Sequence, residues 1–226
     1  MKKVGVDIVI PSWNYAQYLS EAVDSALSQE GADIHVVVVD DGSDDATQEV
    51  LERYDQEAVT VARHATRRGL SAARNTGLSL LRHDWVAFLD ADDVFPAERT
   101  AALWHAINGN PDMIALGLAE EFGEAGVVVA NDRPTGLSLQ TALISRRVME
   151  QVGGFDESLT YGGNVDWMAR AVRERVEMRA TSAVTLRRRI HGHNMSRQIS
   201  SHPQDYLTIV RRHGEALAKL RSMTQA

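Results

Sequence analysis

The sequence predicts an α/β fold with a mainly parallel central sheet and helices on both of its faces. Short apolar runs alternate with segments whose apolar residues recur at helical spacing, and this alternation is typical of parallel sheets. Polar clusters follow three of the runs, at residues 12–14, 40–41 and 90–93. Parallel strands end at one edge of a sheet, where open α/β folds bind their ligands. We therefore expect a ligand site at that edge.

The first 93 residues repeat a strand-then-helix unit. Strands are predicted over residues 4–10, 35–39, 59–62 and 85–89. Pro11 ends the first strand because it lacks a backbone N–H. The apolar spacing of residues 19–27 predicts the first helix. The second is predicted from Ser43, as its N-cap, to about Tyr54, and the third from Gly69 to about Leu81.

The second half of the chain is less regular. Strands are predicted over residues 113–119, 127–130 and 185–190, and helices over 96–108, 145–152, 164–176 and 203–223. Ser145 is the expected N-cap of its helix, and residues 153–156 are expected to form a turn. The last helix is amphipathic, which is compatible with packing on the domain or with a homodimer.

Composition excludes several classes of protein. The 226 residues are 44% hydrophobic, which is enough for one sizeable core. A net charge of −7 and a pI near 5.6 give no basic footprint for nucleic acid. There are no cysteines, so neither disulfides nor zinc–thiolate sites are expected. No stretch approaches the roughly 20 apolar residues of a membrane span, and the first residues lack a signal-peptide pattern. We expect a soluble, cytoplasmic protein.

Carboxylates are concentrated at the end of the fourth predicted strand, at Asp90, Asp92 and Asp93. Packed together they repel one another, and a cation relieves this conflict. Oxygen ligands suit Mg2+ or Mn2+, which bind one or two carboxylates together with substrate phosphates. His191, with His193 close by in sequence, is a candidate to complete a site begun by Asp92. The alternatives are that the aspartates cap the next helix and that the histidines are structural.

Other polar residues each allow two interpretations. Trp13 suits either stacking on a nucleobase or a place as a core-lining or lid aromatic. Asp41 suits a hydrogen bond from a base N–H or ordinary turn chemistry before a glycine. Arg74 suits neutralisation of a phosphate or a solvated surface position. The run from Arg187 to Arg189 suits a solvated strand face, or a groove in which one arginine binds a diphosphate or an acidic acceptor.

Five motifs occur in one order along the chain. They are Val-Ile-Pro-Ser-Trp-Asn from Val9, Val-Val-Asp-Asp-Gly-Ser from Val38, Gly-Leu-Ser-Ala-Ala-Arg-Asn from Gly69, Phe-Leu-Asp-Ala-Asp-Asp from Phe88 and Gly-Gly-Phe-Asp from Gly153. In this order and spacing they resemble the family 2 glycosyltransferases of the GT-A fold, over roughly residues 4–200. The resemblance implies a Rossmann-like sheet in a single domain spanning residues 1–226. Its parts are a nucleotide-sugar-binding half (1–95), a smaller acceptor-side half (96–200) and a C-terminal helix (203–223).

The resemblance also implies inverting transfer of a hexose from a nucleotide-diphosphate sugar, with a UDP-sugar as the expected donor, to an acceptor hydroxyl. It implies that Asp92 holds Mn2+ or Mg2+, with His191 near the metal, and that the ion offsets charge on the leaving diphosphate. Trp13 is implied to stack on the base, Asp41 to contact it and Asp90 to contact the ribose. The residues implied to bind the donor are Pro11, Ser12, Trp13, Asp41, Gly69, Arg74, Asp90 and Ala91.

One position departs from the family pattern. Where relatives carry a Glu-Asp pair whose Asp deprotonates the acceptor, this chain has Gly163 and Asn164. An amide cannot accept that proton. Asp166 is a weak substitute, because two residues along a helix turn a side chain by about 200°. Other candidates are Asp156, Glu157 and a carboxylate of the acceptor. Alternatively, the asparagine replaces a natural aspartate, or the alignment shifts here by a residue or two.

Asn164 leaves two functions open. One is a transferase slowed by about 10²–10⁴-fold through loss of its base. The other is a catalytically silent nucleotide-sugar-binding protein. A nucleotidyltransferase is disfavoured because residues 11–15 contain neither the glycine nor the basic residue that would grip a triphosphate.

Overall fold

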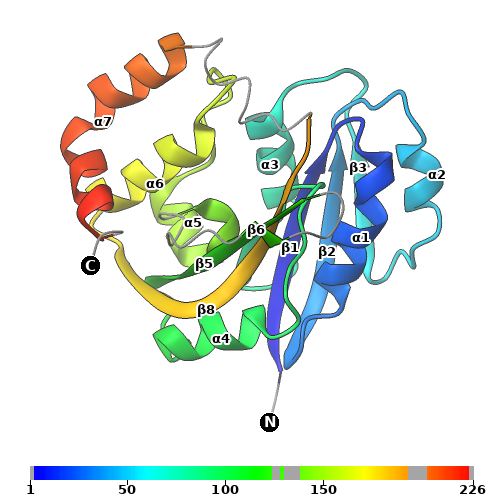
Figure 1. The fold of residues 1–226 in the computed structure, drawn as a ribbon, viewed down its shortest axis with the longest axis horizontal. Coiled ribbons are helices and arrows are strands. Elements are labelled where there is room, and N and C mark those ends of the chain that lie inside the picture. The colour runs from blue at the N-terminus through cyan, green and yellow to red at the C-terminus, as the bar shows by residue number, and fades with distance from the viewer. Residues whose placement is uncertain (1–2, 124–127, 130–137, 193–202, 224–226) are drawn as a thin grey trace.

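The computed structural model describes residues 3–123, 128–129, 138–192 and 203–223 (Figure 1). Its first half contains four parallel strands in the order β3–β2–β1–β4. They are β1 (Val4–Ser12), β2 (Ala32–Asp40), β3 (Val59–Arg63) and β4 (Trp85–Phe88). Ser12 pairs with Asp40, and Val9 pairs with Phe88, so the strands end at one edge. The predicted α/β fold with a mainly parallel sheet is confirmed.

The sheet continues into the second half of the chain. β7 (Ala142–Ser145) lies antiparallel between β4 and β5 (Met113–Gly123), and β5 also pairs with β6 (Val128–Val129) and β8 (Glu177–Ile190). β8 begins well before the strand predicted over residues 185–190. Its residues 177–184 are exposed or half-buried and contain no apolar run, so their pairing with β5 is invisible to periodicity.

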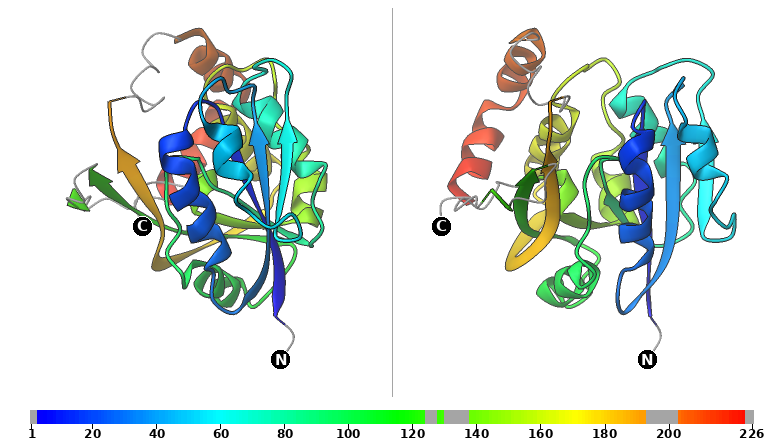
Figure 2. Two further views of the ribbon diagram at one scale, coloured as in Figure 1. Left: turned by 90° about the vertical axis from the view of Figure 1, so that its right-hand side faces the viewer. Right: turned by 45° about the vertical axis from the view of Figure 1, so that its right-hand side comes forward.

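Helices cover both faces of the sheet, as predicted (Figure 2). One face carries α1 (Ala16–Leu27), α2 (Thr47–Leu51) and α4 (Arg99–Ile107). The other carries α3 (Leu70–Leu78), α5 (Arg146–Val152) and α6 (Gly163–Arg173). Side chains alternate along a strand, so β1 contributes Ile8 to the first core and Val9 to the second.

The helix after β2 is shorter than predicted. α2 begins at Thr47, because the Ser43 Oγ accepts the Asn14 backbone N–H (3.0 Å) instead of capping a helix. Asp45 supplies the acceptor instead, with its Oδ1 3.0 Å from the Thr47 backbone nitrogen. The predicted cap of α5 is confirmed, since the Ser145 Oγ accepts the Val148 N–H at 3.0 Å.

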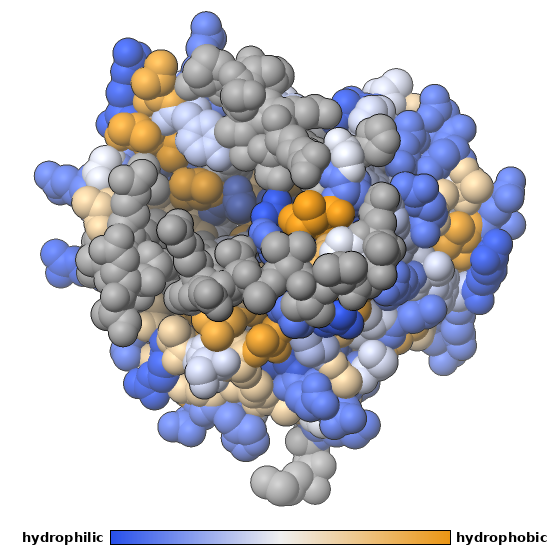
Figure 3. Space-filling view, viewed as in Figure 1, coloured by the Kyte–Doolittle hydropathy of each residue, from blue (hydrophilic) through white to orange (hydrophobic). Residues whose placement is uncertain are grey.

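The C-terminal helix α7 (Pro203–Met223) packs against α6, at the left of Figure 1. Its backbone leaves helical geometry at His213 (φ −135°, ψ 18°). Leu207 and Val210 are exposed on α7, and hydrophobic residues gather over this helix at the upper left of Figure 3. Within the described residues, no helix has the length and apolar character needed to cross a membrane. The homodimer stays a prediction.

Arg99, the first residue of α4, is fully buried and makes no ion pair with any described residue. Its Nη2 donates to the Ala142 carbonyl (2.5 Å), and its guanidinium carbon lies 3.8 Å from the centroid of the Phe95 ring. Its Nε and Nη1 have no partner in the part of the chain described. Burial lowers the pKa of Arg99 to about 9. An unpaired buried cation of this kind opposes folding.

We expect Arg99→Met to leave the free energy of unfolding unchanged or to raise it. Methionine keeps most of the side-chain volume and removes a charge whose burial costs several kcal/mol, against about 1.5–3 kcal/mol for the lost hydrogen bond. Urea unfolding measures the difference. Arg99→Ala removes the same charge but leaves a cavity, so it should be about 2–5 kcal/mol less stable than Arg99→Met. A loss above about 3 kcal/mol in Arg99→Met would mean that the guanidinium stabilises the fold.

Candidate active site

The polar clusters that follow β1 and β2 are joined directly at the sheet edge. The Asp41 backbone N–H donates to the Ser12 carbonyl at 2.8 Å. Pro11 lies within β1, opposite Val39, so the prediction that it ends the first strand is wrong. Ala91 follows β4, and both residues are buried. The Ser12 hydroxyl is buried too, and no described residue hydrogen-bonds to it. A buried hydroxyl is normally paired, so Ser12 has hydrogen-bonding capacity left for a ligand or for water.

Asp41 holds the loop between β3 and α3. Its Oδ1 accepts the Arg68 backbone N–H (2.8 Å) and lies 2.6 Å from His64 Nδ1, while its Oδ2 accepts the Gly69 N–H (2.7 Å). Gly69 has φ 96°, in the left-handed region that favours glycine. His64, which also lies 2.8 Å from the Thr76 hydroxyl, is a site residue that the sequence did not single out. Its position directly after β3, at the strand ends where the other polar residues lie, is the sequence feature that could have indicated His64.

Trp13 lies outside the core and is 37% exposed, so the core-lining interpretation is wrong. The guanidinium carbon of Arg67 lies 3.5 Å from the centroid of the Trp13 ring, a cation–π contact. The ring therefore offers a flat face at the sheet edge, and in this structure Arg67 covers it. Nothing in the sequence marks Arg67, because the contact depends on the loop that Asp41 holds.

Asp90 connects α3 with the chain just before β7. Its Oδ1 accepts from Arg74 Nη2 (3.0 Å), and its Oδ2 accepts from Gln140 Nε2 (2.7 Å). Arg74 is only 1% exposed, its guanidinium carbon lies 5.5 Å from the centroid of the Phe155 ring, and desolvation lowers its pKa. Arg74 is therefore not a solvated surface charge. Arg74 contacts the acid cluster through its hydrogen bond to Asp90.

Asp92 and His191 are in contact across the sheet edge. His191 Nε2 lies 2.9 Å from Asp92 Oδ2, and the buried imidazole packs against the Tyr18 ring with 5.0 Å between centroids. Burial and then repulsion by Asp90 raise the pKa of Asp92, against the opposing effect of the hydrogen bond from His191. From the sequence, His191 is a candidate to complete a site begun by Asp92, and the structure places the two side chains in contact.

Asp93 is a buried member of the same acid cluster. Its Oδ1 accepts the Arg189 backbone N–H at 2.8 Å. Burial, followed by repulsion from Asp92 and Asp90, raises its pKa well above the usual range. α4 begins only at Arg99, so the interpretation of these aspartates as helix caps is wrong. Negative charge at the end of β4 is thus incompletely compensated.

The donor atoms of the Asp92–His191 pair suit a divalent cation. A carboxylate oxygen and an imidazole nitrogen are both metal ligands, and the two side chains lie in contact, 2.9 Å apart. No cluster of three or more His, Cys, Asp or Glu side chains suited to a metal occurs within the described ranges. The pair therefore suits an ion that takes its other ligands from substrate and water. His193 lies outside the described residues.

The basic run in β8 is paired with acidic side chains. The pairs are Arg187–Glu120, Arg188–Glu121 and Arg189–Glu21. Arg189 Nε also donates to the Asp92 carbonyl at 3.0 Å. The run is therefore not an unpaired basic face. Arg189 contacts the acid cluster at the Asp92 carbonyl and, through its backbone N–H, at Asp93.

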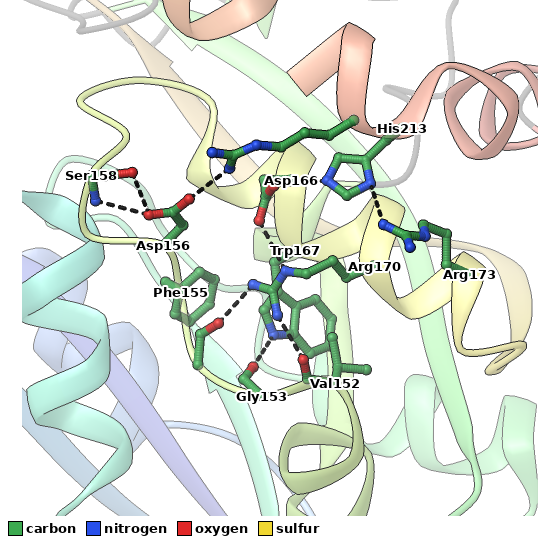
Figure 4. A network of polar contacts seen from close by, with 12 residues as sticks. Val152, Gly153, Phe155, Asp156, Ser158, Asp166, Trp167, Arg170, Arg173 and His213 are labelled. Carbon is green, nitrogen blue, oxygen red and sulfur yellow. Dashed lines mark hydrogen bonds and ion pairs between the residues drawn. The ribbon is translucent and has the colours of Figure 1, made fainter. Parts of the chain in front are cut away.

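Two of the candidate base positions, Asn164 and Asp166, lie on α6, and Figure 4 shows Asp166. Asn164 is in the first turn, and its side chain has no hydrogen bond within the described residues. Asp166 is 2% exposed, with Arg170 Nε 2.9 Å from Oδ2 and His213 Nε2 2.9 Å from Oδ1. Both of its oxygens are engaged by cationic or donor groups, which indicates a structural role.

The two other candidate carboxylates follow the Gly153–Gly154 turn. Asp156 accepts from Ser158 and from Arg212 Nη1 (2.8 Å), and these contacts lower its pKa, which makes it a weaker base. Glu157 is exposed and accepts from Asn75 Nδ2 (2.9 Å) and Arg68 Nη2 (3.3 Å). The contacts of Asp156 therefore make it the weaker candidate of the two, and Glu157 remains.

Comparison with known proteins identifies the family. A model of glycosyl transferase family 2 matches residues 7–161, and the chain belongs to this family. The uncharacterized glycosyltransferase EpsJ of Bacillus subtilis is 28% identical over 149 residues, which cover 65% of this chain and 42% of EpsJ. The succinoglycan biosynthesis protein ExoO of Rhizobium meliloti is 38% identical over 94 residues, covering 42% of this chain and 27% of ExoO. The chain thus spans less than half the length of these relatives.

Solved structures share the fold. S. aureus TarS 1-349 superposes with a TM-score of 0.74 at 19% identity, covering 94% of this chain and 65% of that one. The mannosyltransferase PcManGT from Pyrobaculum calidifontis, in complex with GDP-Man and Mn2+, superposes with a TM-score of 0.71 at 19% identity, covering 93% and 65%. At such identities the likeness shows the fold alone, which is the GT-A fold.

We expect Asp41→Asn to lower the free energy of unfolding by about 1–3 kcal/mol. The amide of asparagine would turn a donor toward one of the N–H groups that the carboxylate now accepts, and the loop around Gly69 would loosen. Urea unfolding measures the loss. The matched control is Asp44→Asn, because Asp44 is exposed and accepts from Asn14 Nδ2 at 2.7 Å. Equal losses in the two variants would contradict the anchoring role of Asp41.

Proposed function

We propose that this chain is an inverting, metal-dependent glycosyltransferase that moves a hexose from a nucleotide-diphosphate sugar to an acceptor hydroxyl. The observation that carries the proposal is the contact of Asp92 with His191, 2.9 Å apart beside Asp90 at the sheet edge. In this proposal residues 1–95 form the donor-binding half of a single domain, residues 96–200 form the acceptor-side half, and α7 packs on the latter through α6.

The proposed donor is a UDP-sugar whose base stacks on Trp13. Asp41 contacts the base and Asp90 the ribose, with Arg74 orienting Asp90 through their 3.0 Å contact. The remaining proposed donor-site residues are Pro11, Ser12, Gly69 and Ala91. The buried hydroxyl of Ser12, which has no partner among the described residues, supports a polar ligand at this edge. Further support comes from a TarS structure in complex with UDP-GlcNAc, although PcManGT was solved with GDP-Man.

Asp92 and His191 are proposed to hold Mn2+ or Mg2+. When bound, such an ion acts as a Lewis acid on the diphosphate and offsets the charge that develops on the leaving group. The Mn2+ in the PcManGT complex supports this choice. The contribution of the chain is to fix the carboxylate: Arg189 binds the Asp92 carbonyl from one side, and the imidazole of His191 is wedged against Tyr18.

For deprotonation of the acceptor, position 164 carries an amide that cannot accept the proton. Asp166 is engaged by Arg170 and His213, and the contacts of Asp156 lower its pKa. We therefore propose a slow transferase whose rate rests on donor positioning and charge stabilisation, with Glu157 as the remaining candidate base.

Asn164 also favours a second function. A protein with Asn164 in place of a base suits the binding of a nucleotide sugar without transfer. The two functions differ in turnover: the slow transferase releases the nucleotide when an acceptor or water attacks, whereas the silent binder retains intact donor.

We expect Asp92→Asn to weaken metal-supported donor binding by about 10–100-fold, because the amide is a poorer ligand than the carboxylate. Isothermal titration of UDP in Mn2+ and in chelator, on the wild type and the variant, measures the effect. Asp44→Asn removes an exposed carboxylate outside the pair and should behave as the wild type. If Mn2+ tightened binding equally in Asp92→Asn, the metal assignment would be wrong.

We expect Asn164→Asp to increase release of the nucleotide by about 10²–10⁴-fold, because it supplies the missing base. The assay is release of UDP from a panel of UDP-sugars, with water or a sugar as acceptor. Asn164→Ala tests whether loss of the amide alone changes the rate, and it should not. A variant that binds the donor as the wild type does but gains no turnover would rule out position 164 as the base position.

A further inference from the structure

A concave site lies away from the acid cluster, between the 153–156 turn, α6 and α7 (Figure 4). Its volume is about 450 Å³, within the usual range of small-ligand pockets. The charged or titratable groups that line it are Arg170, Arg173, Arg212, Asp156, Asp166 and His213. None of them belongs to the proposed donor or metal site, and the two carboxylates, Asp156 and Asp166, are each paired with an arginine.

One wall of this α6–α7 pocket is fixed and electrically neutral. The buried Asp166 carboxylate is held by Arg170 Nε at 2.9 Å. The other guanidinium nitrogens of Arg170 donate to the Val152 and Gly154 carbonyls, both at 2.6 Å. With all three of its nitrogens engaged, Arg170 ties α6 to the turn and has little capacity left for a ligand.

His213 continues this wall toward Arg173. Its Nε2 lies 2.9 Å from the second oxygen of Asp166, and its Nδ1 lies 3.5 Å from Arg173 Nη1. A guanidinium can only donate, so Arg173 is the donor in this contact. Arg173 has no carboxylate partner among the described residues.

Arg212 faces the same space from α7. It pairs with Asp156 at 2.8 Å through Nη1. Three guanidinium groups thus face two carboxylates, which leaves one positive charge in excess. Successive residues of a continuous helix point about 100° apart. The departure of α7 from helical geometry at His213 accompanies the presence of both Arg212 and His213 in the pocket lining.

We propose that the α6–α7 pocket binds a phosphate or carboxylate group through Arg173, the arginine of its lining that has no carboxylate partner among the described residues. A guanidinium fork matches the two oxygens of such a group, and the pocket volume leaves room for a sugar unit attached to it. The oxyanion is either a free ion or part of a sugar phosphate. The site is separated from the Arg74–Asp90 pair by the buried Phe155 ring, so its occupancy does not require a donor.

The test is isothermal titration of inorganic phosphate and of a hexose 1-phosphate in chelator, which removes metal-dependent binding elsewhere. Arg173→Gln should weaken binding of both by about tenfold or more, since a charged hydrogen bond is lost. Arg147→Gln is the matched control, because Arg147 is an exposed arginine paired with Asp112 outside the pocket. It should bind both ligands as the wild type does. Thermal unfolding checks that each variant is folded.

The outcomes separate the sources of the oxyanion. Equal affinity for the two ligands identifies a site for a free ion, and tighter binding of the hexose phosphate identifies a site for a phosphorylated sugar. Asp92→Asn should leave both affinities unchanged, so the result does not depend on the proposed transferase. No binding by the wild type, or equal weakening in Arg147→Gln and Arg173→Gln, would overturn the proposal.

Discussion

The electrostatic constraint on which this structure depends is the repulsion among Asp90, Asp92 and Asp93. Like charges at such short range destabilise one another unless partners compensate them. The partners come from distant parts of the chain: Arg74 from α3, Gln140 from the segment before β7, Arg189 from β8 and His191 just beyond it. The two halves of the chain are therefore joined at the acid cluster. Folding the second half against the first builds the site and stabilises its charge at once.

Much of the first half followed from the sequence, because its strands are buried runs with polar ends and its helices have regular apolar spacing. The meeting of Ser12, Asp41 and Asp90 at one edge follows from parallel topology alone. The extent of β8 and the contact of Gln140 with Asp90 did not follow from it. Both depend on partners far along the chain and leave no local pattern. Ser43 was wrong as a helix cap because a distant backbone N–H, that of Asn14, uses its hydroxyl.

The same side-chain arrangement occurs twice in this molecule, in two different settings. Asp41, His64 and Thr76 are linked by contacts of 2.6 and 2.8 Å near the ligand edge. Asp7, His35 and Thr60 are linked by contacts of the same lengths, where Asp7 also accepts the backbone N–H groups of Arg82 and His83. In each case the aspartate anchors a loop between secondary-structure elements. An Asp–His–Thr chain is here a means of holding backbone, and only its location relates one copy to the ligand site.

The contact of Arg67 with Trp13 changes what a binding measurement at this ring reports. A base that stacks on the indole must first displace the guanidinium, whose interaction at an exposed site is worth about 0.5–1 kcal/mol. The observed affinity is then the difference between two stacking partners and is weaker by about two- to fivefold than for a bare ring. Removing Arg67 can thus strengthen the stacking of a base on Trp13, while the loss of its positive charge weakens the attraction for a negatively charged ligand. In this structure the guanidinium of Arg67 occupies the face of the indole and competes with a base for it.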